Sequence, residues 1–247
     1  MSTPETHHPD RSIQLTTAEN VRDLGGYSTR NGSKTQWRRF VRSADMNTLS
    51  ESDQSALIDY GITTVIDLRM QKEIATHPNV FTHASTVDFR VHDFWGTRFD
   101  TYRSTNKTAP GYQKLADLYC AGLEQSGFVM ADIMTTFAED SRTGFAFHCR
   151  SGKDRTGLVA AMLLSIAEVP HTTICEDFAL TKEYLNSQAI NPINSGKPGA
   201  WLLDCEAETM HCTLQFLDQK FGGVIEYLQV QGVSTDSLQT IKDKLLD

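Results

Sequence analysis

The sequence predicts an α/β fold, in which helices flank a central, mostly parallel sheet. Two observations support this prediction. Short runs of apolar and β-branched residues alternate along the chain with longer helical patterns. A strand at 145–149 also leads through a glycine-containing loop into a helix that is apolar on almost all sides, as a core helix is.

The first helix and the strands after it have recognisable boundaries. Ser50 is a typical N-cap with Asp53 three residues later, so we expect a helix that Gly61 ends. Residues 62–68 are β-branched and apolar, as expected of a buried strand. Residues 87–91 alternate between apolar and polar side chains and are a candidate for a further strand.

The second half of the chain is mainly helical. Residues 111–139 have a helical pattern that breaks near Ser126 and Gly127. The apolar helix that follows the 145–149 strand ends before Pro170. Further helices are expected over 171–185, 206–231 and 234–246.

A single domain accounts for most of the chain. Its 247 residues suffice to bury a large core, and neither an internal repeat nor a low-complexity linker divides them. We therefore expect one domain over residues 12–247, preceded by a disordered polar tail over residues 1–11. Residues 186–210 form either a lid over a pocket or an ordinary loop.

Composition argues against several classes of protein. The formal net charge is −8 and no basic stripe is present, so we expect no nucleic-acid partner. No apolar run resembles a signal peptide or reaches the length of a membrane span. We expect a cytoplasmic protein without stable membrane insertion, with export by a signal-less route as the alternative. The five cysteines show no metal-binding spacing, so neither a metal nor another cofactor is expected.

The chemistry is concentrated in one stretch, which reads His-Cys-Arg-Ser-Gly-Lys-Asp-Arg-Thr-Gly over residues 148–157. A tight loop and a helix N-terminus both offer unpaired N–H groups to an anion. Arg155 adds a planar fork that matches two phosphate oxygens. The same positive field stabilises a thiolate at Cys149, which is then a nucleophile. The expected phosphate-binding residues are Arg150, Ser151, Gly152, Lys153, Asp154 and Arg155.

This stretch resembles the catalytic loop of the cysteine-dependent protein tyrosine phosphatase superfamily. Its form H-C-x-x-G-K-D-R-T-G is similar to that of a bacterial and fungal branch, and the resemblance covers roughly residues 12–247. It implies a tyrosine phosphatase-like fold. Four distant segments also resemble that branch: NVRDLGGY at 20–27, VRSA at 41–44, GITTVIDLR at 61–69 and FGGVIEYL at 221–228.

The chemistry assigns roles to four residues of the stretch. Cys149 attacks phosphorus and forms a phosphocysteine, which water hydrolyses, while Arg155 and the loop N–H groups hold the phosphate oxygens. Thr156 is expected to donate its hydroxyl to the sulfur. His148 is expected to orient the loop, because its side chain faces away from the nucleophile on an alternating strand.

The leaving group needs a proton, and three aspartates are candidates for the acid. Asp154 is our first choice, because it resembles an aspartate of the loop that the family uses in catalysis. Asp67 is a second candidate by resemblance, and an ion pair with an arginine is its alternative interpretation. Asp93 can instead lie on a mobile acid loop like that of other tyrosine phosphatases.

Outside the loop, Asn20, Arg22 and Asp23 form a polar run. They either brace the catalytic loop or simply precede a turn at the Gly-Gly pair that follows.

Three functions fit these features. The first is hydrolysis of phosphotyrosine, and of phosphoserine and phosphothreonine as well, in proteins, with inorganic phosphate as product. The second is a phosphoinositide phosphatase: Lys153 resembles a lysine of such enzymes, while the acidic composition opposes a membrane surface. For Lys153 itself, the alternative is a solvated surface lysine. The third is a non-catalytic module that binds phosphorylated ligands, which the intact Cys149 and Arg155 argue against. A sulfurtransferase is remoter, because the loop ends in Arg-Thr-Gly.

Overall fold

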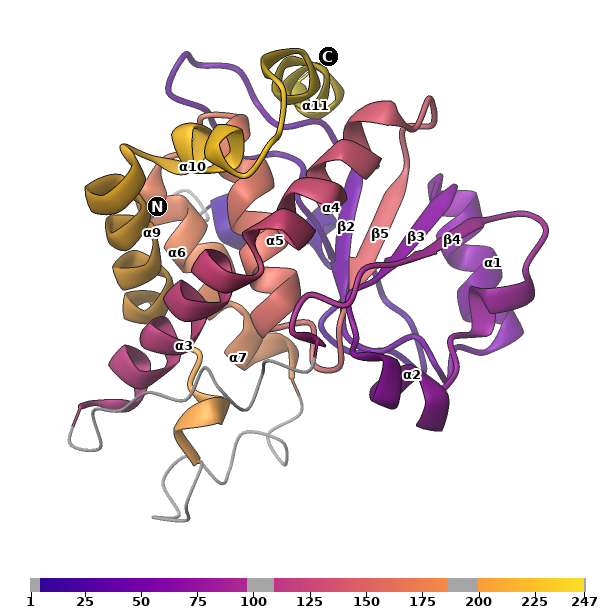
Figure 1. Ribbon diagram of the computed structural model, residues 1–247. Helices are drawn as coiled ribbons and strands as arrows, with labels where there is room; N and C mark the ends of the chain where they lie inside the picture. Colours follow the sequence, from indigo (N-terminus) through magenta and orange to yellow (C-terminus); the bar gives the residue numbers. More distant parts are fainter. Residues whose placement is uncertain (1–4, 97–108, 186–199, 247) are drawn as a thin grey trace.

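A computed structural model describes residues 5–96, 109–185 and 200–246 (Figure 1). Within these residues, five strands form one sheet with the order β1-β2-β5-β3-β4. The strands are β1 (Arg22–Asp23), β2 (Phe40–Ser43), β3 (Thr64–Asp67), β4 (Asp88–Val91) and β5 (Phe145–His148). All neighbouring pairs are parallel except β1 with β2. The prediction of an α/β fold with a mostly parallel central sheet is therefore confirmed.

The register of the sheet brings three strand ends together at one edge. β5 lies at the centre, where His148 is paired with Ser43 of β2 on one side and with Asp67 of β3 on the other. Because parallel strands all point the same way, the segments that leave these strands emerge side by side. Ligands bind at this edge in open α/β sheets.

Helices cover both faces of the sheet (Figure 1). The α-helices are α1 (Glu51–Tyr60), α2 (Gln71–Thr76), α3 (Gly111–Gln125), α4 (Gly127–Glu139), α5 (Asp154–Ile166), α6 (His171–Ala179), α7 (Thr181–Tyr184), α9 (Ala207–Phe221), α10 (Val224–Val230) and α11 (Thr235–Leu246). Short 3₁₀ turns are η1 (Glu5–His7), η2 (Pro9–Arg11), η3 (Val80–His83) and η6 (Ala200–Leu203). No helix of the described ranges has the length and apolar character that crossing a membrane requires.

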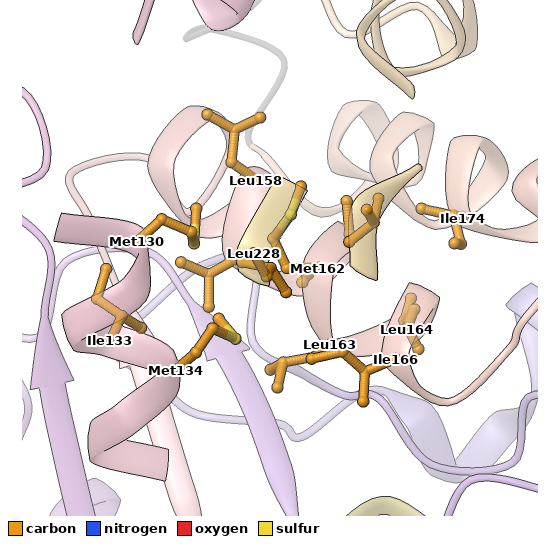
Figure 2. Close-up of a cluster of buried hydrophobic side chains, with 14 of the residues drawn as sticks. Met130, Ile133, Met134, Leu158, Met162, Leu163, Leu164, Ile166, Ile174 and Leu228 are labelled. Carbon is orange, nitrogen blue, oxygen red and sulfur yellow. The ribbon is translucent and has the colours of Figure 1, made fainter. Parts of the chain in front are cut away.

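Alternation along β5 divides the core in two. Phe145 and Phe147 pack into the larger cluster, which helices α3 to α6 and α9 to α11 complete. Ala146 points to the opposite face, into a smaller cluster that includes Leu57 of α1. Figure 2 shows part of the larger cluster, in which Met162 of α5 lies among side chains of α4 and α10. The apolar helix after the 145–149 strand is thus a core helix.

Several predicted boundaries are confirmed. Ser50 caps α1 by accepting the Asp53 N–H at 3.1 Å, and Gly61 ends the helix with φ of 111°. The predicted break at Ser126 separates α3 from α4. The predicted helix over 171–185 is divided into α6 and α7, and the segment 206–231 is divided into α9 and α10 by two glycines with positive φ.

The N-terminal segment differs from the expected disordered tail. Residues 5–11 form η1 and η2, and Arg11 is completely buried. Its Nη1 donates to the Asp23 carbonyl at 2.8 Å, and its guanidinium lies 3.7 Å from the centre of the Tyr27 ring. The segment has no apolar run, which is why the sequence predicted disorder. It is ordered because the buried Arg11 anchors it. Residues 1–4, and residues 186–199 of the segment considered as a lid, lie outside the described residues.

Candidate active site

The predicted phosphate-binding loop connects β5 to α5 at the sheet edge where the strand ends meet. We call residues 149–155 the catalytic loop. Cys149 opens it and is only 1% exposed. Gly152 has φ of 65°, and a Cβ at this position would lie 2.5 Å from the carbonyl oxygen of Ser43. A side chain would therefore be strained and would collide with the end of β2, so the loop requires glycine here.

His148 is buried on the other face of the sheet from Cys149, since neighbouring side chains of a strand alternate. Asn79 accepts the Phe81 N–H through Oδ1 at 2.9 Å, so its amide nitrogen faces His148 Nε2 at 2.8 Å. Nε2 is then the acceptor, and Nδ1 carries the proton toward the Cys149 carbonyl at 3.2 Å. Burial lowers the pKa of His148, which favours this neutral form.

Arg155 lies at the other end of the loop and is 7% exposed. Its Nη1 and Nη2 contact Glu73 of α2 at 2.5 and 3.1 Å. Its buried Nε has no partner in the described part of the chain and remains a donor for an anion. Burial lowers the pKa of Arg155, but the charges of Cys149 and Glu73 raise it, and the balance is upward.

Thr156 occupies the first turn of α5 and is completely buried. Its hydroxyl has no hydrogen-bond partner among the described residues. A buried hydroxyl without a partner is costly, so this group is suited to donating to a thiolate or to a bound oxyanion. Its predicted bond to the sulfur stays a prediction.

Asp154 is the next-to-last residue of the catalytic loop, and its side chain is 26% exposed. Tyr119 of α3 donates its hydroxyl to Asp154 Oδ1 at 2.6 Å. The ammonium of Lys153 lies 3.3 Å from the same oxygen. Oδ1 is thus held by two donors, and Oδ2 faces none of the described groups that donate hydrogen bonds.

The other two candidate acids are engaged elsewhere. Asp67 is completely buried, and its carboxylate pairs with Arg69, the closest contact being 2.6 Å to Nη2. Burial raises the pKa of Asp67, but the hydrogen bonds and charge of Arg69 lower it, and the net direction is downward. Asp93 accepts backbone N–H groups of Gln71 at 3.1 Å and Gly96 at 2.7 Å. Asp67 therefore forms the ion pair with an arginine that was its alternative interpretation. Asp93 instead accepts the N–H groups of a turn and of the first residue of α2.

Lys153 is buried, with 3% exposure, and is not the solvated surface lysine considered as its alternative. Its ammonium donates to the carbonyls of Leu202 at 2.5 Å and Asp204 at 2.9 Å. With the Asp154 contact, all three protons of the ammonium have acceptors. Lys153 thus ties the catalytic loop to η6 and to the residue that follows it.

The catalytic loop borders a pocket of about 420 Å³. Its polar side consists of Arg150, Ser151, Lys153, Asp154 and Arg155 of the loop, together with Glu19 at the rim. Its apolar side consists of Ala44, Leu185, Leu202 and Leu203. Among the described residues, no group of three or more His, Cys, Asp or Glu side chains is arranged to hold a metal ion. The pocket is suited to an anion at the loop and an apolar group against the leucines.

Comparison with known proteins agrees with this geometry. A model of the tyrosine phosphatase family matches residues 13–247. The chain belongs to the tyrosine phosphatase family. This phosphatase is 29% identical over 218 residues to a tyrosine-protein phosphatase of Nostoc commune, a match that covers 83% of this chain and 74% of that one. It is 25% identical over 232 residues to a protein of Cupriavidus necator provisionally named a tyrosine-protein phosphatase, covering 88% and 82% of the two chains. As a phosphatase, it takes a phosphorylated substrate and releases inorganic phosphate.

Two residues of the phosphatase site were missed from the sequence. Glu73, the partner of Arg155, lies in a six-residue helix without a distinctive pattern. Tyr119, the partner of Asp154, lies inside the long α3 helix and was assigned no role. The one available signal for Glu73 was its position four residues after the segment 61–69, which resembles the family, and no local pattern marked Tyr119.

Proposed function

We propose that this phosphatase hydrolyses phosphotyrosine in proteins through a phosphocysteine intermediate, with phosphoserine and phosphothreonine as further substrates. The observation that carries the proposal is the placement of Cys149 and Arg155 at the two ends of the loop between β5 and α5, where Glu73 holds the Arg155 guanidinium. Arg155 keeps an Nε without a partner among the described residues, so a nucleophilic cysteine and a guanidinium donor are both available in one loop for attack on a bound phosphate. Leu185, Leu202 and Leu203 favour an aromatic ester, because they offer an apolar wall to a phenyl ring.

In the first step, the Cys149 sulfur forms a bond to phosphorus while the bond between phosphorus and the ester oxygen breaks. The leaving oxygen takes a proton from Asp154 Oδ2, since Oδ1 is occupied by Tyr119 and Lys153. Both partners stabilise the carboxylate that remains. Arg155 and the loop N–H groups hold the equatorial oxygens, where negative charge spreads in the transition state.

In the second step, water attacks the phosphocysteine. The sulfur–phosphorus bond breaks, the thiolate of Cys149 is regenerated and inorganic phosphate leaves. Asp154 takes up the proton that the water loses, so the same carboxyl group acts first as acid and then as base. The hydroxyl of Thr156 can donate to the sulfur as it leaves, which gives its unpartnered group a use.

A phosphoinositide is a weaker candidate substrate. That alternative rested on Lys153 as a second positive charge for a substrate with several phosphates. The Lys153 ammonium is instead surrounded by the carbonyls of Leu202 and Asp204 and by the Asp154 carboxylate. It would have to leave these acceptors to reach a second phosphate group.

The test measures phosphate release from a phosphotyrosine peptide, a phosphoserine peptide and a soluble phosphoinositide. The wild-type protein should prefer the phosphotyrosine peptide, and Cys149→Ser should lose activity by several orders of magnitude. Retained activity in Cys149→Ser would refute the phosphocysteine mechanism. A preference for the phosphoinositide would replace the proposed substrate class.

A matched pair of variants identifies the acid. Asp154→Asn should lose most activity on substrates with poor leaving groups, such as phosphoserine, and less on p-nitrophenyl phosphate, whose leaving group needs little protonation. Asp93→Asn is the control and should show no such dependence on the leaving group. The reverse result would move the acid role to Asp93.

A further inference from the structure

We propose that Asn20 and Arg42 are positioning residues that aim two backbone N–H groups of the catalytic loop at the phosphate. The proposal rests on the phosphate-binding function of this loop proposed above. Both residues lie more than a hundred positions before the loop and belong to segments whose role the sequence left open. Neither side chain has to touch the substrate.

The starting observation is that four consecutive carbonyl groups of the loop are each held by a donor outside it. The acceptors and donors are Cys149 O with His148 Nδ1 at 3.2 Å, Arg150 O with Asp45 N at 3.0 Å, Ser151 O with Asn20 Nδ2 at 2.9 Å, and Gly152 O with Arg42 Nη2 at 2.9 Å. These contacts come from β5, from the segments beside β1 and β2, and from β2 itself. They fix the plane of every peptide unit between residues 149 and 153.

Fixing a carbonyl also fixes the N–H that follows it. A trans peptide unit is planar, so its C=O and its N–H point in opposite directions. The N–H groups of residues 150–153 therefore point away from the bracing donors. Within the described residues none of these N–H groups donates to another group of the protein. Arg150, Ser151 and Lys153 line the pocket, and Gly152 lies between the last two of them in the loop. The four N–H groups together form a nest of donors suited to an oxyanion.

Asn20 sets the peptide unit that carries the Gly152 N–H. Its backbone has φ of 57°, a left-handed conformation that asparagine tolerates better than most residues. Arg22 donates to its Oδ1, which fixes the orientation of the amide and turns Nδ2 toward the Ser151 carbonyl. Asn20 is 2% exposed, so water does not replace this bond.

Arg42 sets the next unit, which carries the Lys153 N–H. Asp177 of α6 holds its Nη1 at 2.5 Å, and Nη2 reaches the Gly152 carbonyl. The same carboxylate accepts from Arg22 Nε at 3.2 Å and from the Tyr27 hydroxyl at 2.9 Å. Burial and the charge of Arg22 lower the pKa of Arg42 to about 10, so the guanidinium remains charged at neutral pH.

Asn20→Asp is the sharpest test, because it changes one donor into an acceptor at nearly constant shape. The new oxygen faces the Ser151 carbonyl and repels it, so the peptide unit turns and the Gly152 N–H no longer points toward a phosphate held by the loop. Affinity for inorganic phosphate, measured by calorimetry, should fall about tenfold. The kcat/KM for a phosphotyrosine peptide should fall about a hundredfold, as for the loss of one oxyanion donor.

Two more variants separate positioning from charge and from stability. Asn20→Gly tolerates the same backbone conformation and removes the donor without adding charge, so it should also weaken phosphate binding. Thr16→Val is the control from the same N-terminal segment as Asn20. It removes a hydroxyl that donates to Asp53 of α1, away from the loop, and should leave phosphate affinity unchanged. If folded Asn20→Asp and Asn20→Gly bind phosphate as tightly as the wild type, the proposal for Asn20 is refuted.

Arg42 is better tested without substitution, because its removal would leave the buried Asp177 with one fewer partner and unsettle the fold. In the wild-type protein, added inorganic phosphate should move the amide NMR signals of both Gly152 and Lys153, over the concentration range in which phosphate inhibits. Inhibition without movement of these two signals would overturn the proposal while keeping the phosphatase assignment. Absence of inhibition, of signal movement and of substrate hydrolysis would reject the proposed function, and this proposal with it.

Discussion

Arg155 has its two terminal nitrogens bound to Glu73 and its Nε free of described partners. The ion pair therefore fixes the orientation of the guanidinium, while Arg155 also lines the pocket. A planar fork binds phosphate well only when its orientation is fixed beforehand. Burial raises the pKa of Glu73, but Arg155 lowers it more, so the carboxylate is charged under ordinary conditions. Under the proposed function, Glu73 is a positioning residue that orients Arg155 without touching phosphate.

Glu73→Gln tests this arrangement. The amide keeps the size of the side chain but loses the charge that holds Arg155, so kcat/KM for a phosphotyrosine peptide should fall about tenfold. KM should carry much of the change, because Arg155 binds the phosphate in the ground state as well. The exposed Glu51→Gln is the control for a simple loss of charge. Equal kinetics for Glu73→Gln and the wild type would contradict the role of Glu73.

Tyr119→Phe tests whether Asp154 is held in place for proton transfer. The substitution removes the hydroxyl bond to Asp154 and keeps the ring, which packs against Phe178. Hydrolysis of phosphoserine peptides should slow about tenfold, whereas p-nitrophenyl phosphate should be little affected. Tyr112→Phe in the same helix is the matched control. A uniform loss on both substrates would point to a packing defect instead.

At the scale of elements, the close approach of the catalytic loop to the end of β2 determines which residue position 152 accepts. Gly152→Ala places a Cβ in a left-handed conformation and 2.5 Å from the Ser43 carbonyl oxygen. We expect a loss of at least about 2 kcal/mol in the free energy of unfolding, measured with urea, together with loss of activity. Gly32→Ala has a similar positive φ but no atom within 4 Å of the new Cβ. The difference between the two variants isolates the cost of the collision, and equal losses would show that the loop has room to yield.

Elements with local signals were predictable from the sequence. Ser50 and Gly61 predicted the ends of α1, and the β-branched run predicted β3. β1 and β2 had no such signal, because β1 is two residues long and Arg42 of β2 is a charged residue in a completely buried position. Arg42 is acceptable there because Asp177, 135 positions away, neutralises it. A contact of that length leaves no trace in local periodicity.

The same reasoning applies to the site. The catalytic loop was predictable because its residues are consecutive, so chemistry and spacing could be read together. Among its supports, Asn20 was predicted only as one of two alternatives for the polar run at 20–23, and its bond to Ser151, 131 positions away, selects the bracing alternative. Glu73 was not predicted, because it lies 82 positions from Arg155 and no local pattern marks it. The buried environment of Lys153 depends on the carbonyls of Leu202 and Asp204, which no motif announces. Pairing between distant segments is a property of the folded chain.

At the scale of the whole molecule, Asp140 links three elements at the end of α4. Its carboxylate accepts from Thr64 of β3 at 2.9 Å and from Arg142 Nε at 2.8 Å. Its backbone carbonyl accepts from Lys244 of α11. Burial raises the pKa of Asp140, but Arg142 and Thr64 lower it to about 2. The folded protein thus prefers the charged carboxylate more strongly than the unfolded chain does.

This difference predicts how acid affects stability. Because the pKa of Asp140 is depressed in the folded state, its contribution is complete above its ordinary value of 3.8 and is lost as pH falls toward about 2. Asp140→Asn should therefore lower the free energy of unfolding by about 1 kcal/mol at pH 7, with the gap to the wild type closing between pH 4 and pH 2. Urea unfolding at several pH values measures it. The exposed Asp59→Asn should show no gap at any pH, and a constant gap for Asp140→Asn would contradict the prediction.

Asp177 also has a consequence for the order in which the molecule is assembled. The carboxylate that holds Arg42 lies on α6, which follows the catalytic loop in the chain, whereas Arg22 and Arg42 precede it. The loop peptides can adopt their final planes only after α6 has docked on β1 and β2. During refolding from urea, the far-ultraviolet helix signal should therefore recover before phosphatase activity does. Maturation of the catalytic loop would be among the last events of folding, and simultaneous recovery of both signals would show that α6 docks early.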